Sequence, residues 1–176
     1  MVNEFMYNWT SIPDSLNRVG NHPWRVPAAS MNMTGYRVAL PASPPYQAGT
    51  AGPVHINRTA IVTISNSTQG TAEAIVSYPS GVYDIVVDYY DLYPGISTWT
   101  LYLNNTKLGS WKGNHENTLG HELTYFLDGN SESRIMFANV TVAKGDTIKV
   151  VGVPDGGEPA PLGYVAFLPS GSTILD

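Results

Sequence analysis

The chain contains no cysteine, so neither a disulfide framework nor a thiolate metal site is possible. Positive charge is also scarce: nine Lys and Arg side chains stand against 14 Asp and Glu in 176 residues, for a net charge of -5. Nucleic-acid binding depends on clustered Lys and Arg, so this balance argues against a nucleic-acid partner. No apolar run approaches the length of a membrane span, and no signal peptide follows Met1. The composition therefore predicts a soluble protein without a membrane partner.

The usual catalytic motifs are missing as well. No G-x-S-x-G nucleophile elbow occurs, and none of the four histidines shows H-x-x-x-H spacing for zinc. A glycosidase needs two carboxyl groups at one cleft. Asp84, Asp88 and Asp91 follow one another along a single predicted strand, and their parity predicts a solvent-exposed face. The sequence therefore favours a protein that is not an enzyme on this chain, with an autonomous glycan-processing enzyme as an alternative.

Alternating apolar and polar side chains are the main pattern that is present. In residues 81–103, Tyr83, Ile85, Val87 and Tyr89 share one strand face, and Trp99 begins a second such face across a Pro-Gly corner. We expect these two segments to pair in one half-buried antiparallel sheet, with Tyr89 and Trp99 in the core. Similar segments recur at short spacing, which predicts an all-β jelly-roll β-sandwich. The other predicted strands are 31–40, 60–65, 71–78, 107–111, 133–142, 147–153 and 162–168.

The first 50 residues have a different composition. Six prolines interrupt any period, yet the segment also carries Phe5, Tyr7, Trp9, Trp24 and Tyr36, too many large rings for a solvated linker. We therefore predict that residues 1–50 form a Pro-rich aromatic arm packed on a body of residues 51–176.

The longest irregular stretch, residues 112–131, is the candidate recognition site. Long irregular loops in compact domains are usually functional, and sugar sites combine an aromatic ring with amides and carboxyls. Trp111 could equally cap the sandwich, and the two tyrosines before the Pro-Gly corner could be plain edge aromatics. The predicted carbohydrate-binding residues are Tyr90, Tyr93, Trp111, Asn114, His115, Tyr125 and Asp128.

Acidic residues in two turns have structural or metal-binding interpretations. Asp146 is expected to hold a turn by accepting backbone N–H groups. Asp155 and Glu158 could ligate calcium, which prefers carboxylate and carbonyl oxygens, or could brace a Gly-rich turn. Bracing is favoured, so the sequence predicts no cofactor beyond a possible structural calcium ion.

N-glycosylation sequons are more frequent than chance predicts. Six N-x-Ser/Thr sequons occur, where about two are expected from the composition. The excess predicts a secreted glycoprotein with glycans on exposed turns. A Thr- and Asn-rich β surface that produces sequons by chance is the alternative. The sequons begin at Asn8, Asn32, Asn57, Asn66, Asn104 and Asn139.

Several of these segments resemble a known family. Residues 81–91, Trp111, residues 144–148, residues 152–162 and Tyr164 resemble the C-terminal domain of family 115 glycoside hydrolases, which are xylan α-1,2-glucuronidases. The same segments are similar to carbohydrate-binding modules of families 35 and 6. The resemblance covers about residues 54–168, and the Pro-Asp-Gly-Gly-Glu-Pro-Ala-Pro-Leu run is its specific part. It implies a jelly-roll accessory module whose relatives bind plant polysaccharides, some of them with calcium.

Two departures from the family pattern bear on the ligand. Members usually place Asp after the Leu of the closing strand, whereas this chain has Gly163, and the loss of that carboxylate weakens a calcium site. In the family, the loop that follows the Trp is typically acidic and leads into an arginine-rich stretch. In this chain Lys112-Gly-Asn-His-Glu-Asn117 stands in its place.

These observations lead to a first functional hypothesis. It is a non-catalytic carbohydrate-binding accessory module for glucuronoxylan-type cell-wall polysaccharide, part of or alongside an α-glucuronidase-like glycoside hydrolase. The alternative is a structural or oligomerisation domain without glycan affinity, whose partner is a catalytic domain or a second copy of the chain.

Overall fold

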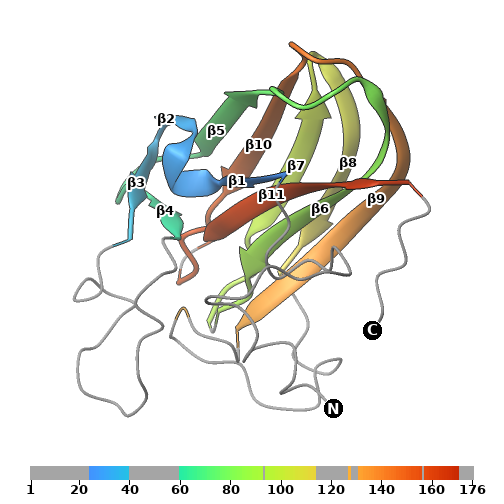
Figure 1. The fold of residues 1–176 in the computed structure, drawn as a ribbon. Helices are drawn as coiled ribbons and strands as arrows, with labels where there is room; N and C mark the ends of the chain where they lie inside the picture. Colours follow the sequence, from blue (N-terminus) through green and yellow to red (C-terminus); the bar gives the residue numbers. More distant parts are fainter. Residues whose placement is uncertain are drawn as a thin grey trace, which may run out of the picture.

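The computed structural model describes residues 24–39, 60–92, 94–113, 127, 131–155 and 157–170. These residues form eleven strands and one short 3-10 helix, η2 (Ala28–Ser30), so the predicted all-β class is confirmed (Figure 1). None of the described segments contains a helix with the length and apolarity of a membrane span. The strands are β1 (Arg25–Pro27), β2 (Asn32–Thr34), β3 (Tyr36–Val38), β4 (Ile61–Thr63), β5 (Gly70–Ile75), β6 (Gly81–Tyr90), β7 (Thr98–Leu103), β8 (Thr106–Lys112), β9 (Glu132–Val142), β10 (Thr147–Val153) and β11 (Leu162–Pro169).

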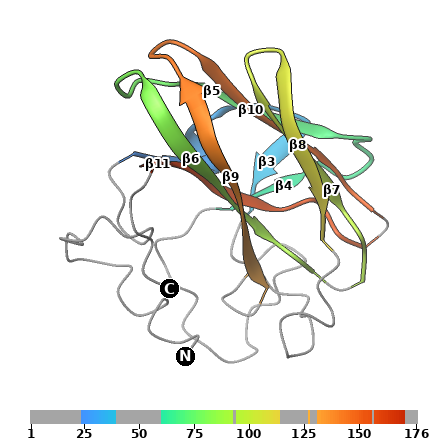
Figure 2. The ribbon, with the colours of Figure 1, turned by 90° about the vertical axis from the view of Figure 1, so that its right-hand side faces the viewer.

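The strands make two antiparallel sheets that pack face to face as a sandwich (Figure 2). Sheet A has the order β3-β4-β11-β6-β9, and β1 pairs with β11 beside β4. Sheet B has the order β2-β5-β10-β7-β8. Strands that are distant in the chain therefore lie next to one another, as a sandwich with crossover connections requires.

Aromatic side chains fill much of the space between the sheets. Tyr89 of sheet A lies 4.8 Å from Trp99 of sheet B, measured between ring centroids, and both side chains are buried. The predicted core positions of these two rings are confirmed. A second aromatic group, at the other end of the sandwich, joins Phe167 to Tyr83 and Tyr78, and Trp24 packs on both tyrosines. Rings of this size contribute most of the buried apolar area of such a core.

The expected pairing of the two segments in residues 81–103 is wrong. β6 lies in sheet A and β7 in sheet B, so the two strands face one another across the core. Glu158 holds the segment that passes from one sheet to the other, since its carboxylate accepts the backbone N–H groups of Leu92 and Ser97. Each strand buries the face that was predicted to be buried. The two buried faces, however, pack against each other across the sandwich instead of lying side by side in one sheet.

The predicted strand 31–40 is also divided in two. β2 and β3 are separated by Gly35, whose φ of 71° turns the chain, and they belong to different sheets. The other predicted strands are present with ends shifted by a few residues. Residues 1–23 and 40–50 of the predicted arm lie outside the described residues, so the arm stays a prediction.

Candidate functional site

Of the seven residues predicted to bind carbohydrate, the structure describes two, Tyr90 and Trp111. Both are buried, with 3% and 8% of their surface exposed. Trp111 is stacked on Trp99 with ring centroids 6.0 Å apart, and the rings of Tyr89 and Phe137 each lie 5.8 Å from it. Tyr90 belongs to a separate apolar cluster with Leu92. In these positions the two rings pack the sandwich, and neither presents an open ring face. The other five residues, Tyr93, Asn114, His115, Tyr125 and Asp128, lie outside the described residues.

Glu158 organises the end of the sandwich near these rings. Its carboxylate is 1% exposed and accepts hydrogen bonds from the backbone N–H groups of Leu92, at 2.9 Å, and Ser97, at 2.6 Å. The Ser97 hydroxyl donates to the Glu158 carbonyl oxygen at 2.9 Å. A carboxylate that accepts amide hydrogen bonds satisfies donors that would otherwise be buried alone. Glu158 thus joins the β6–β7 and β10–β11 connections.

A second acidic residue, Asp91, lies beside Glu158. A Cβ atom built on Gly113 would be 3.0 Å from Oε1 of Glu158 and 3.2 Å from Oδ1 of Asp91, so the two carboxyl groups meet at this glycine. Burial raises the pKa of Glu158 to about 7, and the negative charge of Asp91 adds to the rise, while the two amide hydrogen bonds oppose it. Glu158 is therefore an acid that gains a proton near neutral pH.

Asp155 has a similar structural role. Its Oδ2 accepts the backbone N–H of Ile96 at 3.0 Å, and its backbone pairs with that of Glu158 in both directions. No group of three or more His, Cys, Asp or Glu side chains suited to a metal is present in the part of the chain that the structure describes. Because both Glu158 oxygens already accept amide hydrogen bonds, this arrangement favours the bracing interpretation of Asp155 and Glu158. Calcium binding by the pair stays a prediction.

The expected solvent exposure of the aspartates in β6 and after it is wrong for two of the three. Asp88 is 1% exposed and Asp91 is fully buried. A Cβ atom on Gly163 would lie 2.6 Å from Oδ2 of Asp88, so the glycine makes room for this carboxylate. Relatives were expected to carry an aspartate at the position of Gly163, and here the carboxylate of the neighbouring strand occupies that space.

Two arginines neutralise the region around Asp88. Burial lowers the pKa of Arg134, but the nearby Tyr164 hydroxyl and the charges of Asp88 and Glu132 raise it more. The Arg25 guanidinium lies 4.0 Å from the centre of the Tyr164 ring, a cation-π contact. Asp88 therefore belongs to a buried charged cluster on the outer face of sheet A. Sequence alternation could place Asp88 outside the core, but it could not show that this face is also buried.

Four of the six predicted glycosylation sites are described, and all four asparagines are exposed. They are not equivalent. Nδ2 of Asn104 donates to Oδ1 of Asp146 at 3.0 Å, whereas Asn66 has a φ of 71° in an exposed turn. The other two described sites are Asn32 and Asn139, and Asn8 and Asn57 lie outside the described residues.

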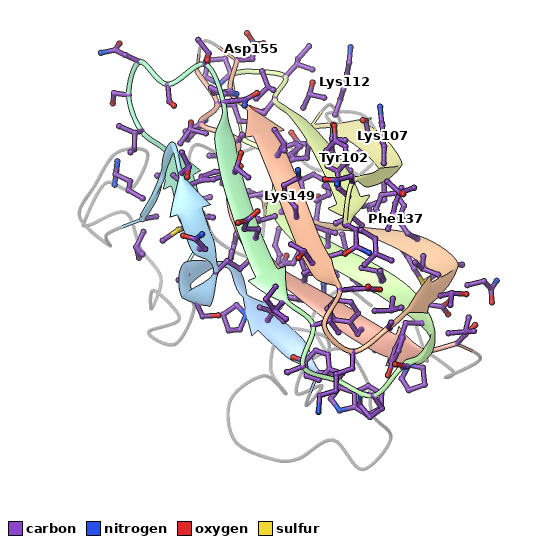
Figure 3. The ribbon with its side chains drawn as sticks, turned by 90° about the horizontal axis from the view of Figure 1, so that it is seen from above. Tyr102, Lys107, Lys112, Phe137, Lys149 and Asp155 are labelled. Atoms are coloured by element: carbon purple, nitrogen blue, oxygen red, sulfur yellow. The ribbon has the colours of Figure 1, made fainter. Side chains whose placement is uncertain are left out.

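A polar surface on the outer face of sheet B was missed by the sequence reasoning. Sheet B directs a tyrosine and three lysines away from the core, and Figure 3 shows Lys149 and Tyr102 side by side with Lys107 and Lys112 beyond them. The alternation of Trp99, Leu101 and Leu103 with polar residues was the available signal, since it places Tyr102 on the outer face.

The fold is that of a carbohydrate-binding module. A native family 35 carbohydrate-binding module from Clostridium thermocellum superposes with a TM-score of 0.52, over 83% of this chain and 98% of that chain. The two sequences are only 11% identical, so the likeness concerns the fold. No protein-family model matches the chain.

Sequence similarity places the chain next to one particular group of enzymes. It is 51% identical over 170 residues to a probable alpha-glucuronidase A from Aspergillus terreus and 48% identical over 171 residues to alpha-glucuronidase A from Aspergillus tubingensis. Each match covers 97% of this chain but 19% of the relative. The chain thus spans about a fifth of the length of these relatives and corresponds to one domain of them. The predicted resemblance to an α-glucuronidase domain with a carbohydrate-binding-module fold is confirmed.

Proposed function

We propose that this domain is a non-catalytic carbohydrate-binding module that directs an α-glucuronidase-like enzyme to glucuronoxylan-type cell-wall polysaccharide. One observation carries the proposal. The chain has the fold of a carbohydrate-binding module, and its sequence is 51% identical to a segment that makes up 19% of a probable alpha-glucuronidase A. A glycan-binding domain attached to a hydrolase raises the local concentration of substrate at the catalytic domain. The partners are then a polysaccharide and a catalytic domain, and the compartment is extracellular.

The buried state of the carboxylates supports a role without catalysis. Asp88, Asp91 and Glu158 have at most 1% of their surface exposed, and Glu158 is bonded to two backbone amides. A general acid or base must come within hydrogen-bond distance of the substrate. Among the described residues these three carboxylates act as structural groups, so we expect no release of glucuronic acid from aldouronic acids by this chain.

Affinity electrophoresis tests the proposal. We expect the chain to be retarded in gels that contain glucuronoxylan and to migrate freely in gels without polysaccharide. The loop variants His115→Ala and Asp128→Ala are expected to reduce the retardation, and Ser77→Ala, at an exposed position between β5 and β6 and outside every sequon, is the matched control. Retardation on none of glucuronoxylan, xylan or pectin would overturn the proposal.

The structural alternative has one observation in its favour. Val82 and Met136, at 46% and 51% exposure, are exposed apolar side chains on β6 and β9, and β9 is the last strand of sheet A. An exposed edge strand with apolar neighbours is a site of association between chains. Sedimentation at increasing concentration tests this alternative. Association that Met136→Lys abolishes would support it, and a monomer throughout would exclude it.

A further inference from the structure

The two sheets differ in what their outer faces expose. On sheet A the outer side chains of Val86, Ala166 and Leu168 are buried, with at most 3% of their surface exposed. On sheet B the outward residues of all five strands are half-buried or exposed. Sheet B therefore offers a broad surface to a ligand. The side chains of this surface come from regular strands, which hold side chains more precisely than loops do.

One row of side chains crosses the whole of sheet B. The strand register places Asn32 opposite Glu73, Glu73 opposite Lys149, Lys149 opposite Tyr102, and Tyr102 opposite Lys107. With neighbouring strands about 4.8 Å apart, the five positions extend over about 19 Å. This is the length of an extended ligand segment rather than of a single small molecule.

Tyr102 lies in this row with a lysine on each side. The Lys149 ammonium is 4.8 Å from the centre of the Tyr102 ring, a cation-π contact that holds the charge over the ring (Figure 3). Lysine side chains commonly lay their apolar stem along a surface while the charged end stays in water. The ring and the ammonium group are therefore presented together.

Hydroxyl groups form the next row on the same face. The Thr100 and Ser110 hydroxyls lie 2.8 Å apart on β7 and β8, and one donates to the other. Each keeps hydrogen-bonding capacity, because a hydroxyl has one donor and two acceptor positions. Beyond them, Thr98 is opposite Lys112. On β7 and β8 the face thus combines the Tyr102 ring, the Thr100 and Ser110 hydroxyls and the ammonium groups of two lysines.

The charge of this face is opposite to that of the whole chain. The chain has a net charge of -5 and only four lysines, yet Lys107, Lys112 and Lys149 lie on this one face against a single acidic strand residue, Glu73 opposite Lys149. Lysine is a compact point charge that pairs with carboxylate or phosphate. A ring that can take the apolar face of a sugar, next to hydroxyls and lysines, fits a sugar that carries a carboxylate.

We propose that the outer face of sheet B binds the uronic acid groups of an acidic polysaccharide, with Tyr102 under a sugar ring and Lys107 and Lys149 on its carboxylates. The inference rests on the proposed function, because it assumes a polysaccharide ligand. It adds a second surface to the predicted loop site and names the chemical group that this surface recognises.

Calorimetric titration of the 176-residue chain tests the proposal with three probes. These are glucuronoxylan, the same polymer with its carboxyl groups chemically reduced to alcohols, and xylohexaose. The double variant Lys107→Gln/Lys149→Gln removes both charges beside the ring. Lys144→Gln is the matched control, because Lys144 is the one lysine in the turn between β9 and β10. Circular dichroism and thermal melting verify that each variant is folded.

The double variant is expected to bind glucuronoxylan about fivefold more weakly than the parent chain, as two exposed ion pairs allow. It should bind the carboxyl-reduced polymer as the parent does, and the parent's affinity for glucuronoxylan should fall as salt is added. Tyr102→Ala should weaken binding of both polymers, since a ring contact does not depend on charge. The control should match the parent throughout.

Four outcomes would overturn the inference. Unchanged affinity of the double variant for glucuronoxylan rejects this face and leaves the proposed function in place. An equal loss in Lys144→Gln shows a general effect of net charge rather than a site. Binding to none of the three probes removes both the inference and the proposed function. Lysine-dependent binding of a purified acidic protein, with glycan binding unchanged, also rejects the inference in favour of a protein partner.

Discussion

The outer faces of the two sheets follow the same sequence rule, but sheet A is buried in the middle of its outer face and exposed at Val82 and Met136, whereas sheet B is open across its strands. On β6 of sheet A, Asp88 alternates with core residues and is 1% exposed among arginines and a tyrosine. On β10 of sheet B, Lys149 alternates with core residues in the same way and is only half-buried, with its ammonium over Tyr102. A polar residue opposite the core is therefore not always a surface residue. Where the outer face of a sheet is also buried, as around Asp88, such a residue becomes part of a buried charged cluster that stabilises the fold.

Substitution of the two charges should separate the faces most clearly. Asp88→Ala removes a buried carboxylate from the charged cluster and leaves Glu132, 3.4 Å from the Arg134 guanidinium, to face both arginines, so we expect the free energy of unfolding to fall by about 3–5 kcal/mol. Lys149→Ala should change the free energy of unfolding by no more than about 0.5 kcal/mol. Urea denaturation of both variants measures the difference. Similar values for the two substitutions would remove the distinction between the faces.

A second contrast concerns two aromatic rings. Trp111 is stacked on Trp99 in the core, so Trp111→Ala should cost about 3 kcal/mol or more. Tyr102 is on the outer face of sheet B, so Tyr102→Ala should reduce stability by less than about 1 kcal/mol while weakening glycan binding. Thermal melting and affinity electrophoresis, run on both variants, measure the two effects. A stable Trp111→Ala variant that has lost glycan binding would return Trp111 to the binding site.

The buried acid at the end of the sandwich predicts a pH dependence that the open face lacks. The folded-state pKa of Glu158, about 7, lies above its ordinary value of 4.5, so its contribution to stability is complete below pH 4.5 and is lost as the pH rises through 7. The difference corresponds to about 2–3 kcal/mol between pH 4.5 and pH 8.

Glu158→Gln cannot titrate, so this part of the pH dependence should disappear in that variant even though the variant loses an amide acceptor. Urea denaturation of both proteins at the two pH values measures it. The same pH dependence in both proteins would show that Glu158 does not titrate near neutral pH in the folded state.

The smallest effect distinguishes the predicted glycosylation sites. A glycan on Asn104 would modify the nitrogen that donates to Asp146, whereas Asn66 has its amide in an exposed turn. We therefore expect higher occupancy at Asn66 than at Asn104 when the chain is secreted from a fungal host. Mass spectrometry of the glycopeptides gives both occupancies. Equal or reversed occupancy would show that the Asn104 hydrogen bond does not limit modification.

Local pattern predicted much of this fold. The alternation of Tyr83 to Tyr89 and of Trp99 to Leu103 identified two strands and their buried faces, and Asp146 holds its turn by accepting the N–H of Ala143 as expected. The pattern could not show which strands pair, because a pair in one sheet and a pair across a sandwich bury the same residues. The position of β6 opposite β7 depends on Glu158, which is more than 60 residues away from the corner that it holds.

The candidate site was less predictable, for a related physical reason. Trp111 ends a strand, and only the tertiary structure shows whether a ring in such a place faces solvent or, as here, Trp99 and Phe137. The row from Asn32 to Lys107 is made by register across five strands, of which only β7 and β8 are consecutive in the chain. Apart from Tyr102 and Lys107, its members are separated by many residues in the sequence, so no local motif could reveal the whole row.

The open face of sheet B is the place where we propose that an acidic glycan binds. An NMR titration of the isotope-labelled chain with a glucuronic acid-bearing xylo-oligosaccharide tests this directly, because it reports every backbone amide and the lysine ammonium groups at once. We predict the largest shift changes on β7, β8 and β10, centred on Tyr102, Lys107 and Lys149. Saturable shifts confined to residues outside sheet B, or no shifts at all, would contradict it.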